Sequence, residues 1–137
     1  MAEHCPQALT LPQVATAAEV EYRTLHTWLK RGLVRATCRS AQGSGNANLF
    51  ARPDALEARI LADLRRAGLD LASLERAASA LQRTPRRLVG DELLLINGTV
   101  VVLDNDATLE QALASRHPAV LYDVAWASRA LQERARL

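Results

Sequence analysis

The 137 residues are enough for one ordinary domain, or a small domain with a compact appendage, and such a chain can bury a core without disulfides. No apolar run approaches the roughly 18 residues of a membrane span and no basic-then-apolar leader opens the chain, so we expect a soluble, cytoplasmic protein. Cys5 and Cys38 lie in no CxxC or His-rich setting, which argues against a zinc site and predicts two reduced thiols.

The formal net charge of +2 is unevenly distributed. Residues 1–87 hold 13 Lys and Arg against 8 Asp and Glu, a charge of +5, whereas residues 88–137 hold 4 against 7, a charge of −3. Between residues 22 and 39 the basic side chains occur with no acid among them: Arg23, Lys30, Arg31, Arg35 and Arg39. A phosphate backbone selects this local field, and a solvated helix face is the alternative interpretation.

The first predicted element is a short helix near the N-terminus. Thr10 is a plausible N-cap, Pro12 lies near the first helical positions, and Gln13 completes a capping box with Thr10. The helix should run to about Ala18 and bury Leu11, Val14 and Ala15.

A second helix is predicted within a few residues, entered at Glu21. Leu25, Trp28 and Leu29 share one face at i, i+3 and i+4, and Gly32 ends the helix in the C′ position. Two short helices joined by a tight turn are typical of a helix-turn-helix.

From residue 33 to 50 the apolar period changes to two. Val34, Ala36 and Cys38 alternate with polar residues, residues 40–46 are rich in Gly and Ser, and apolar residues resume at Leu49 and Phe50. This pattern predicts a β-hairpin with a flexible tip.

Two more helices follow in the predicted order. Pro53 opens the first and Gly68 ends it, with an apolar stripe of Leu56, Ile60, Leu61 and Leu64. Asp70 caps the next, which carries Leu71, Leu74, Ala77, Ala78 and Leu81.

A boundary is predicted at residues 84–87, where Pro85 stops the helix and the charge changes sign. Residues 93–96 and 99–103 are β-rich runs around Asn97-Gly98, the dipeptide preferred in a type I′ hairpin turn. Because both runs are apolar throughout, both faces should be covered by helices or a second subunit. We further expect a short helix over 109–114, a third strand over 119–122 and a last helix from Asp123 through Leu131.

One ordered set of residues runs through the first half of the chain: Leu11, Val14-Ala15, Val20, Thr24-Leu25-His26, Trp28, Gly32-Leu33, the basic hairpin, Asn48-Leu49-Phe50, Asp54, Leu56, the run from Leu64 to Leu71, and Leu74. Their order and spacing resemble the MerR-type winged helix-turn-helix over residues 9–81. The resemblance implies a DNA-binding protein.

The resemblance also implies a contact scheme. The start of the second helix would enter the major groove with Tyr22, Arg23, Thr24, His26 and Thr27. Phosphates would be held by Lys30, Arg31, Arg35 and Arg39. Asn46 and Asn48 would touch backbone or minor groove, and Thr10 completes the set of DNA-binding candidates.

The sequence departs from the family pattern at several places. Family members usually have arginine at His26, a second aromatic residue at Thr27 and Tyr-Arg at Ala47-Asn48, so their base preference does not carry over. They also continue into a long coiled coil and an effector domain, whereas this chain has Pro85 and a β-hairpin there. Ligand sensing is therefore not expected.

Other chemistries have little support in the sequence. His4, His26 and His117 lack partners at ligand spacing, and turn and cap chemistry accounts for Asp104 and Asp106. The stretch 43–45 lacks the Lys and Ser/Thr of a P-loop. We expect no enzyme, no cofactor and no metal site.

The sequence thus predicts an α+β fold: a winged helix-turn-helix with helical extension over residues 9–83, then a small appendage of β-hairpin and helices over 88–137. The first functional hypothesis is a dimeric, nucleoid-associated transcriptional regulator of duplex DNA that dimerises through the appendage. The alternatives are an architectural or excisionase-like DNA-bending factor and a protein-interaction module whose helix-turn-helix does not bind DNA.

Overall fold

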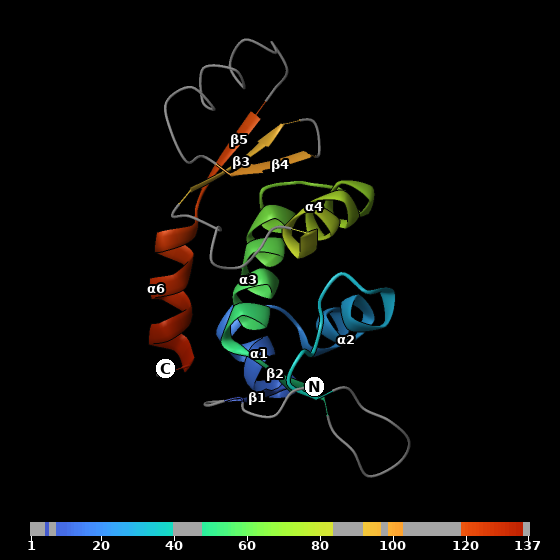
Figure 1. Ribbon diagram of the computed structural model, residues 1–137, viewed down its shortest axis with the longest axis vertical. Helices are drawn as coiled ribbons and strands as arrows, with labels where there is room; N and C mark the ends of the chain where they lie inside the picture. Colours follow the sequence, from blue (N-terminus) through green and yellow to red (C-terminus); the bar gives the residue numbers. More distant parts are fainter. Residues whose placement is uncertain are drawn as a thin grey trace.

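The computed structural model describes residues 5, 8–39, 48–83, 92–96, 99–102 and 119–135. Helices and two small antiparallel sheets alternate along this part of the chain, which confirms the predicted α+β class (Figure 1). In order the elements are β1 (Leu9–Thr10), α1 (Leu11–Ala18), α2 (Tyr22–Arg31), β2 (Leu49–Phe50), α3 (Arg52–Arg66), α4 (Leu71–Arg83), β3 (Glu92–Ile96), β4 (Thr99–Val102), β5 (Ala119–Asp123) and α6 (Val124–Ala135).

The first two helices form as their caps predict. Thr10 Oγ1 accepts from the Gln13 N–H at 3.4 Å, and Gln13 Oε1 accepts from the Thr10 N–H at 2.9 Å, which completes the capping box of α1. The helix ends at Glu19, whose φ of 55° reverses the chain toward α2. α2 ends at Gly32 with φ 80°, where glycine carries no Cβ penalty.

The segment between α2 and β2 differs from the prediction. Residues 33–38 form no strand, and the only ladder contact in the described part of this segment is an isolated bridge from Arg39 to Leu49. β2 pairs instead with β1, in the register Leu9 with Phe50 and Thr10 with Leu49. The predicted hairpin was therefore wrong over residues 33–38.

Other partners occupy the backbone of this segment. The Leu33 N–H donates to the Trp28 carbonyl at 2.9 Å, and the Thr37 N–H donates to Asp54 Oδ2 at 2.9 Å. The alternating Val34, Ala36 and Cys38 are all buried. The period of two in the sequence therefore indicates that every second side chain is buried. Such burial occurs in a paired strand and also in an irregular segment that packs on the core.

Helices α3 and α4 form where they were predicted. Of the predicted stripe of α3, Ile60, Leu61 and Leu64 are buried and Leu56 is partly buried, and Gly68 turns the chain with φ 106°. Leu71 is 40% exposed, because it is the first residue of α4 and the apolar face is covered only one turn later, at Leu74.

The N-cap of α4 predicts a measurable acid sensitivity. Asp70 Oδ1 accepts from the Ser73 N–H at 2.9 Å, and this hydrogen bond holds the pKa of Asp70 below its ordinary 3.8. Because the folded pKa is depressed, the stabilisation is present above the ordinary pKa and is lost as the pH falls through the folded value. We expect the melting temperature to fall less steeply below about pH 4 in Asp70→Asn, which does not titrate, than in the unmodified protein. Identical pH profiles would contradict this.

The second sheet has the strand order β4-β3-β5 and is antiparallel throughout. The hairpin around residues 97–98 and the third strand are confirmed, and Leu95 pairs with Val100 on one side and Val120 on the other. The predicted helix over 109–114 lies outside the described residues. α4 contacts β4 and α6 contacts β3, so helices approach the sheet as expected (Figure 1).

The last helix belongs to the main core. α6 runs beside α3 (Figure 1) and contacts both α1 and α3, and Leu131 is fully buried in the same cluster as Leu25 and Phe50. Arg52 Nη2 also donates to Ser128 Oγ at 3.4 Å. The division into residues 9–83 and 88–137 stays a prediction, and α6 from the second part completes the packing of the first.

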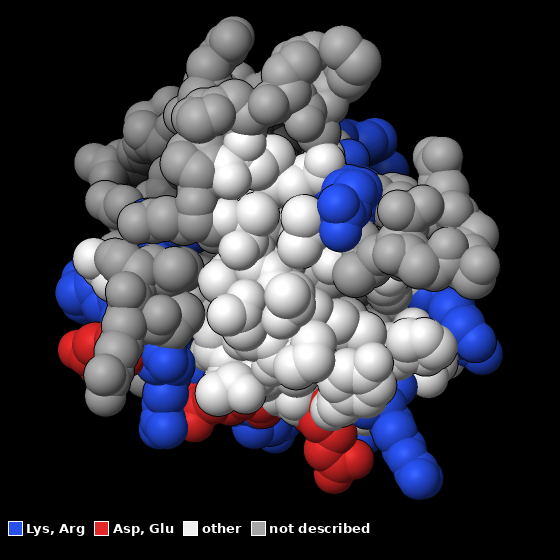
Figure 2. Space-filling model, turned by 90° about the horizontal axis from the view of Figure 1, so that it is seen from below, with Lys and Arg blue, Asp and Glu red and all other residues white. Residues whose placement is uncertain are grey.

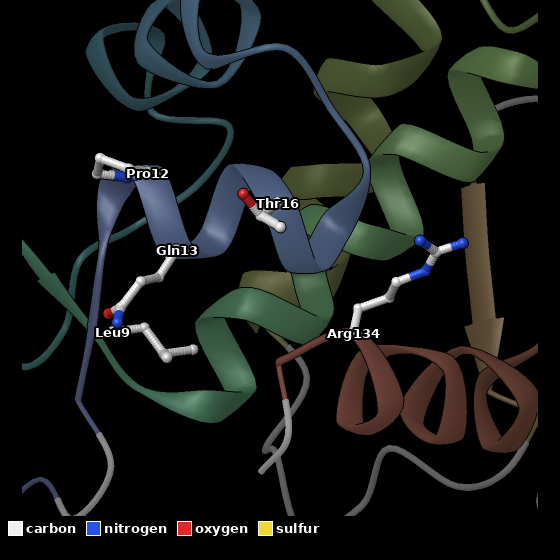
Figure 3. Close-up of a pocket in the computed structure, with 5 residues that line it drawn as sticks. All are labelled: Leu9, Pro12, Gln13, Thr16 and Arg134. Atoms are coloured by element: carbon white, nitrogen blue, oxygen red, sulfur yellow. The ribbon is translucent and has the colours of Figure 1, made fainter.

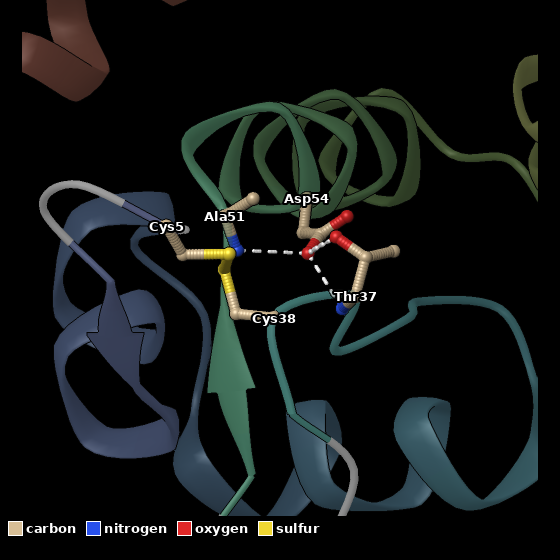
Figure 4. The surroundings of a disulfide bond; sticks show 5 residues. All are labelled: Cys5, Thr37, Cys38, Ala51 and Asp54. Atoms are coloured by element: carbon tan, nitrogen blue, oxygen red, sulfur yellow. Dashed lines mark hydrogen bonds between the residues drawn. A yellow bond between two sulfur atoms is a disulfide. The ribbon is translucent and has the colours of Figure 1, made fainter. Parts of the chain in front are cut away.

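Cys5 and Cys38 form a disulfide, so the prediction of two reduced thiols was wrong (Figure 4). Their Cα atoms are 5.9 Å apart although 33 residues separate them in sequence. β1 and Arg39 both pair with β2, so the segment before β1, with Cys5, and the segment before Arg39, with Cys38, lie close together. No spacing motif signals such a contact.

Neither a membrane-crossing helix nor a metal-binding cluster occurs among the residues that the structure describes. None of their helices is long and apolar enough to cross a bilayer. None of their His, Cys, Asp and Glu side chains gather into a group that could hold a metal ion.

Candidate nucleic-acid interface

Helix α2 divides into an inner and an outer face. Leu25 and Trp28 are 0% and 4% exposed and fix the helix to the core, while Leu29 packs partly against it. The outer face carries the exposed residues Tyr22, Arg23, Thr27, Lys30 and Arg31 and the half-buried Thr24 and His26. This is the division that the helical period predicted, and no acidic side chain lies on the helix.

The first turns of α2 are partly preorganised. The rings of Tyr22 and His26 stack with centroids 6.2 Å apart and planes at 10°, as expected for aromatic residues at i and i+4. Thr27 Oγ1 donates to the Arg23 carbonyl at 3.0 Å. The Thr27 hydroxyl hydrogen is thereby used, so its oxygen faces a ligand as an acceptor.

Two of the predicted phosphate contacts already have acidic neighbours. Arg31 lies 3.7 Å from Glu75, with both side chains about half exposed (53% and 52%), an ion pair that contributes little and leaves the guanidinium at the surface. Arg35 lies 3.8 Å from Glu57, which is only 10% exposed, and Arg35 Nε is buried with no hydrogen-bond partner among the described residues. Arg35 therefore compensates the charge of the largely buried Glu57, in addition to any contact that it makes at the surface.

The remaining candidates surround β2. Leu49 has Thr10 on one side and Arg39 on the other, and Asn48 directly precedes it. Arg39 is exposed, whereas Thr10 is half-buried with its hydroxyl engaged in the cap of α1. Asn46 lies outside the described residues.

A cluster of ion pairs holds the turn that precedes α2. Glu19 pairs with Arg59 at 2.5 Å and with Arg134 at 3.0 Å, and its carbonyl accepts from Arg66 Nη1 at 2.6 Å. The turn is thereby tied to α3 and to α6. Sequence analysis did not find this cluster, and the one local signal was the i, i+4 spacing of Arg59 and Asp63.

Arg59 is the buried member of this cluster, with only 4% of its side chain exposed. Burial lowers its pKa, but the hydrogen bonds and negative charges of Asp63 and Glu19 outweigh that effect and raise the pKa above its ordinary value. The guanidinium therefore stays charged, and it gives the turn a fixed attachment to α3.

The end of the molecule that includes α1 and β1 presents a largely uncharged centre. Figure 2 shows this end, with basic side chains spaced around the margin and acidic ones mainly along one edge. Such a distribution lets basic groups contact phosphates while uncharged groups approach a groove.

A shallow pocket of about 290 Å³ lies between α1 and α6 (Figure 3). It is lined by Leu9, Pro12, Gln13, Thr16 and Arg134. Arg134 is the titratable side chain among the described residues of its lining, and it already pairs with Glu19.

Comparison with known proteins agrees with the helix-turn-helix geometry of α1 and α2. The chain is 30% identical over 90 residues to uncharacterized HTH-type transcriptional regulators of Mycobacterium bovis and of two Mycobacterium tuberculosis strains. The chain is similar to helix-turn-helix transcriptional regulators. The matched part covers 66% of this chain and 40% of each relative, so the chain spans well under half of their length. No family model matches the sequence.

Proposed function

We propose that this chain is a sequence-specific regulator of transcription that binds duplex DNA through α2. The observation that carries the proposal is the division of α2: Leu25 and Trp28 anchor one side, and the other presents polar, aromatic and basic side chains with no acid. An α-helix of this kind fits the major groove of B-DNA, where each base pair offers a distinct set of donors and acceptors. Similarity to HTH-type regulators supports the same function.

The side chains divide by role. Base edges are contacted by the first two turns of α2, through Tyr22, Arg23, Thr24, His26 and Thr27. Phosphates are contacted by Lys30, Arg31 and Arg39, with Thr10, Asn46 and Asn48 near the backbone or minor groove and Arg35 shared with Glu57.

The finer features of the proposal concern assembly, location and the operator. The protein acts as a homodimer through residues 88–137, is cytoplasmic and nucleoid-associated, and reads two half-sites of a pseudo-palindromic operator. An excisionase-like bending factor and a protein-interaction module remain the competing functions.

Salt dependence separates these functions. Fragments selected from random DNA are compared with unselected duplex over a range of ionic strength, with the complex sized by sedimentation. A regulator loses affinity steeply with salt and prefers the selected fragment by roughly a thousandfold or more. An interaction module shows neither effect, and a bending factor is distinguished by a change in the end-to-end distance of the DNA. Absence of duplex binding at low salt would overturn the proposal.

Arg23→Ala tests the recognition face directly. Arg23 is exposed in the first turn of α2, so we expect the affinity for the selected fragment to fall by roughly tenfold, the loss of one good base contact. The melting temperature should stay nearly unchanged because no buried group is uncovered. Affinity is measured by fluorescence anisotropy.

Arg129→Ala is the matched control, because it removes the same charge from an exposed position on α6, on the other side of α3 from α2 (Figure 1). It should leave the affinity within about twofold. If both variants lost the same affinity for DNA, Arg23 would contribute only through the net charge of the protein. Arg35→Ala is a poorer test than Arg23→Ala, because it also deprives the buried Glu57 of a compensating cation.

A further inference from the structure

The disulfide joins the two chain segments that flank β2. β2 has β1 on one side and the Arg39 bridge on the other, and Cys5 and Cys38 lie four residues before β1 and one residue before Arg39. Figure 4 shows the sulfur atoms beside the start of α3, close to Ala51 and Asp54. The bond therefore links the chain segments that lie on the two sides of β2.

The fold around this bond has other supports. Asp54 Oδ2 accepts from the Thr37 N–H at 2.9 Å and from the Ala51 N–H at 2.8 Å, so the residue before Cys38 is attached to α3 independently of the disulfide. The Cys38 N–H also donates to the Leu49 carbonyl at 3.1 Å. Opening the bond frees Cys5 from Cys38 while these contacts remain.

A DNA-binding protein works in the compartment that contains the chromosome, where thiol systems keep cysteines reduced. Disulfides in such proteins are usually transient and either catalytic or redox-sensing. Cys38 is only 7% exposed, but Cys5 is half-buried, which leaves one side of the bond open to a thiol.

We propose that the Cys5–Cys38 disulfide is a reversible redox switch, and that its reduction by a cellular dithiol weakens duplex binding. The inference rests on the proposed DNA-binding function. It adds control of DNA binding by the redox state of a disulfide beside β2, close in sequence to Arg39.

The exchange is balanced in electrons and protons. A thiolate of the dithiol attacks Cys5 Sγ, the Sγ–Sγ bond breaks, and Cys38 leaves as a thiolate that takes up a proton. The second sulfur of the dithiol then attacks the mixed disulfide and releases Cys5. Two electrons pass to the protein, which gains two thiols, and the dithiol becomes a disulfide.

Reduction acts on affinity through preorganisation. In the oxidised form the disulfide holds the segment with Cys5 against Cys38, so less of the chain beside β2 has to be ordered when DNA binds. In the reduced form that ordering must be supplied on binding. We expect the affinity to fall by about threefold to tenfold.

The experiment uses the full chain under native conditions. The protein is equilibrated in buffers with defined ratios of reduced to oxidised dithiothreitol. Part of each sample is alkylated and its thiols are counted by mass spectrometry, and the rest is used to measure binding to a duplex at low salt. We expect both thiols to appear together without denaturant. The affinity for the duplex should fall over the same range of dithiothreitol ratios as the thiols appear. Cys5→Ser, which cannot form the bond, should bind like the reduced protein in every buffer.

Three outcomes would overturn the switch: a disulfide that opens only in denaturant, oxidised and reduced proteins with equal affinity, or a Cys5→Ser variant that still responds to the reductant. If neither form binds any duplex, the proposed function fails and the switch fails with it. The thiol count still reports whether the bond opens, so failure of DNA binding is distinguished from failure of the redox chemistry.

Discussion

Asp54→Ala is expected to destabilise the protein by about 3 kcal/mol or more, because three donors lose the buried carboxylate that accepts their hydrogen bonds. Asp54 is fully buried, and one oxygen accepts from the Thr37 N–H, the Thr37 hydroxyl at 2.6 Å and the Ala51 N–H. Alanine removes this acceptor from the Ala51 N–H at the start of α3 and from the Thr37 N–H in the segment before β2. In a chain of this size the melting temperature should fall by roughly 10 °C.

Asp54→Asn is the matched control, since it keeps the shape and one acceptor oxygen while losing the charge. It should lie between the unmodified protein and Asp54→Ala in urea unfolding. If Asp54→Ala unfolded at the same urea concentration as the unmodified protein, the carboxylate would not anchor residue 37 to α3. The same samples can be tested for DNA binding, because the Asp54 contacts attach Thr37, two residues before Arg39, to α3.

Leu131→Ala should destabilise the protein by roughly 2–5 kcal/mol, the range for leucine removed from a closed core. Leu131 is fully buried in the cluster that also contains Leu25, the anchor of α2, although it lies in the last helix. Urea unfolding should show one transition with an unchanged slope, because α6 and the helix-turn-helix share that core.

Arg129→Ala, two residues away and exposed, should change stability by less than about 0.5 kcal/mol. A Leu131→Ala variant as stable as this control would mean that α6 does not pack on α1 and α3 in solution. The result also bears on truncation: removing residues 88–137 would uncover the faces of α1 and α3 that α6 covers, so we expect a poorly folded product.

Local chemistry made most of the helices and the second sheet predictable. The Thr10 capping box, the C′ position of Gly32 and the hairpin turn at 97–98 each act over a few residues, and short sequence patterns report such features directly. The inner and outer faces of α2 followed from the helical period alone.

Contacts between distant residues were not predictable in this way. The alternation at 34–38 indicated burial correctly but gave no partner, and the partner of β2 is β1, about 40 residues away. The disulfide depends on that pairing. The attachment of Glu19 to Arg59 and Arg134 likewise requires the tertiary fold, because nothing in a single sequence shows which arginine reaches which carboxylate.

The burial of Leu131 beside Leu25 has a consequence for synthesis. Arg52 contacts Ser128 across 76 residues, and the turn before α2 contacts Arg134, so the contacts that hold α6 to the rest of the core have high sequence separation. Such contacts slow folding, because a long loop must close before they form. At a synthesis rate of about 5–20 residues per second, the helix-turn-helix emerges from the ribosome several seconds before its last packing partner. The nascent chain reaches its full stability only after α6 has been made.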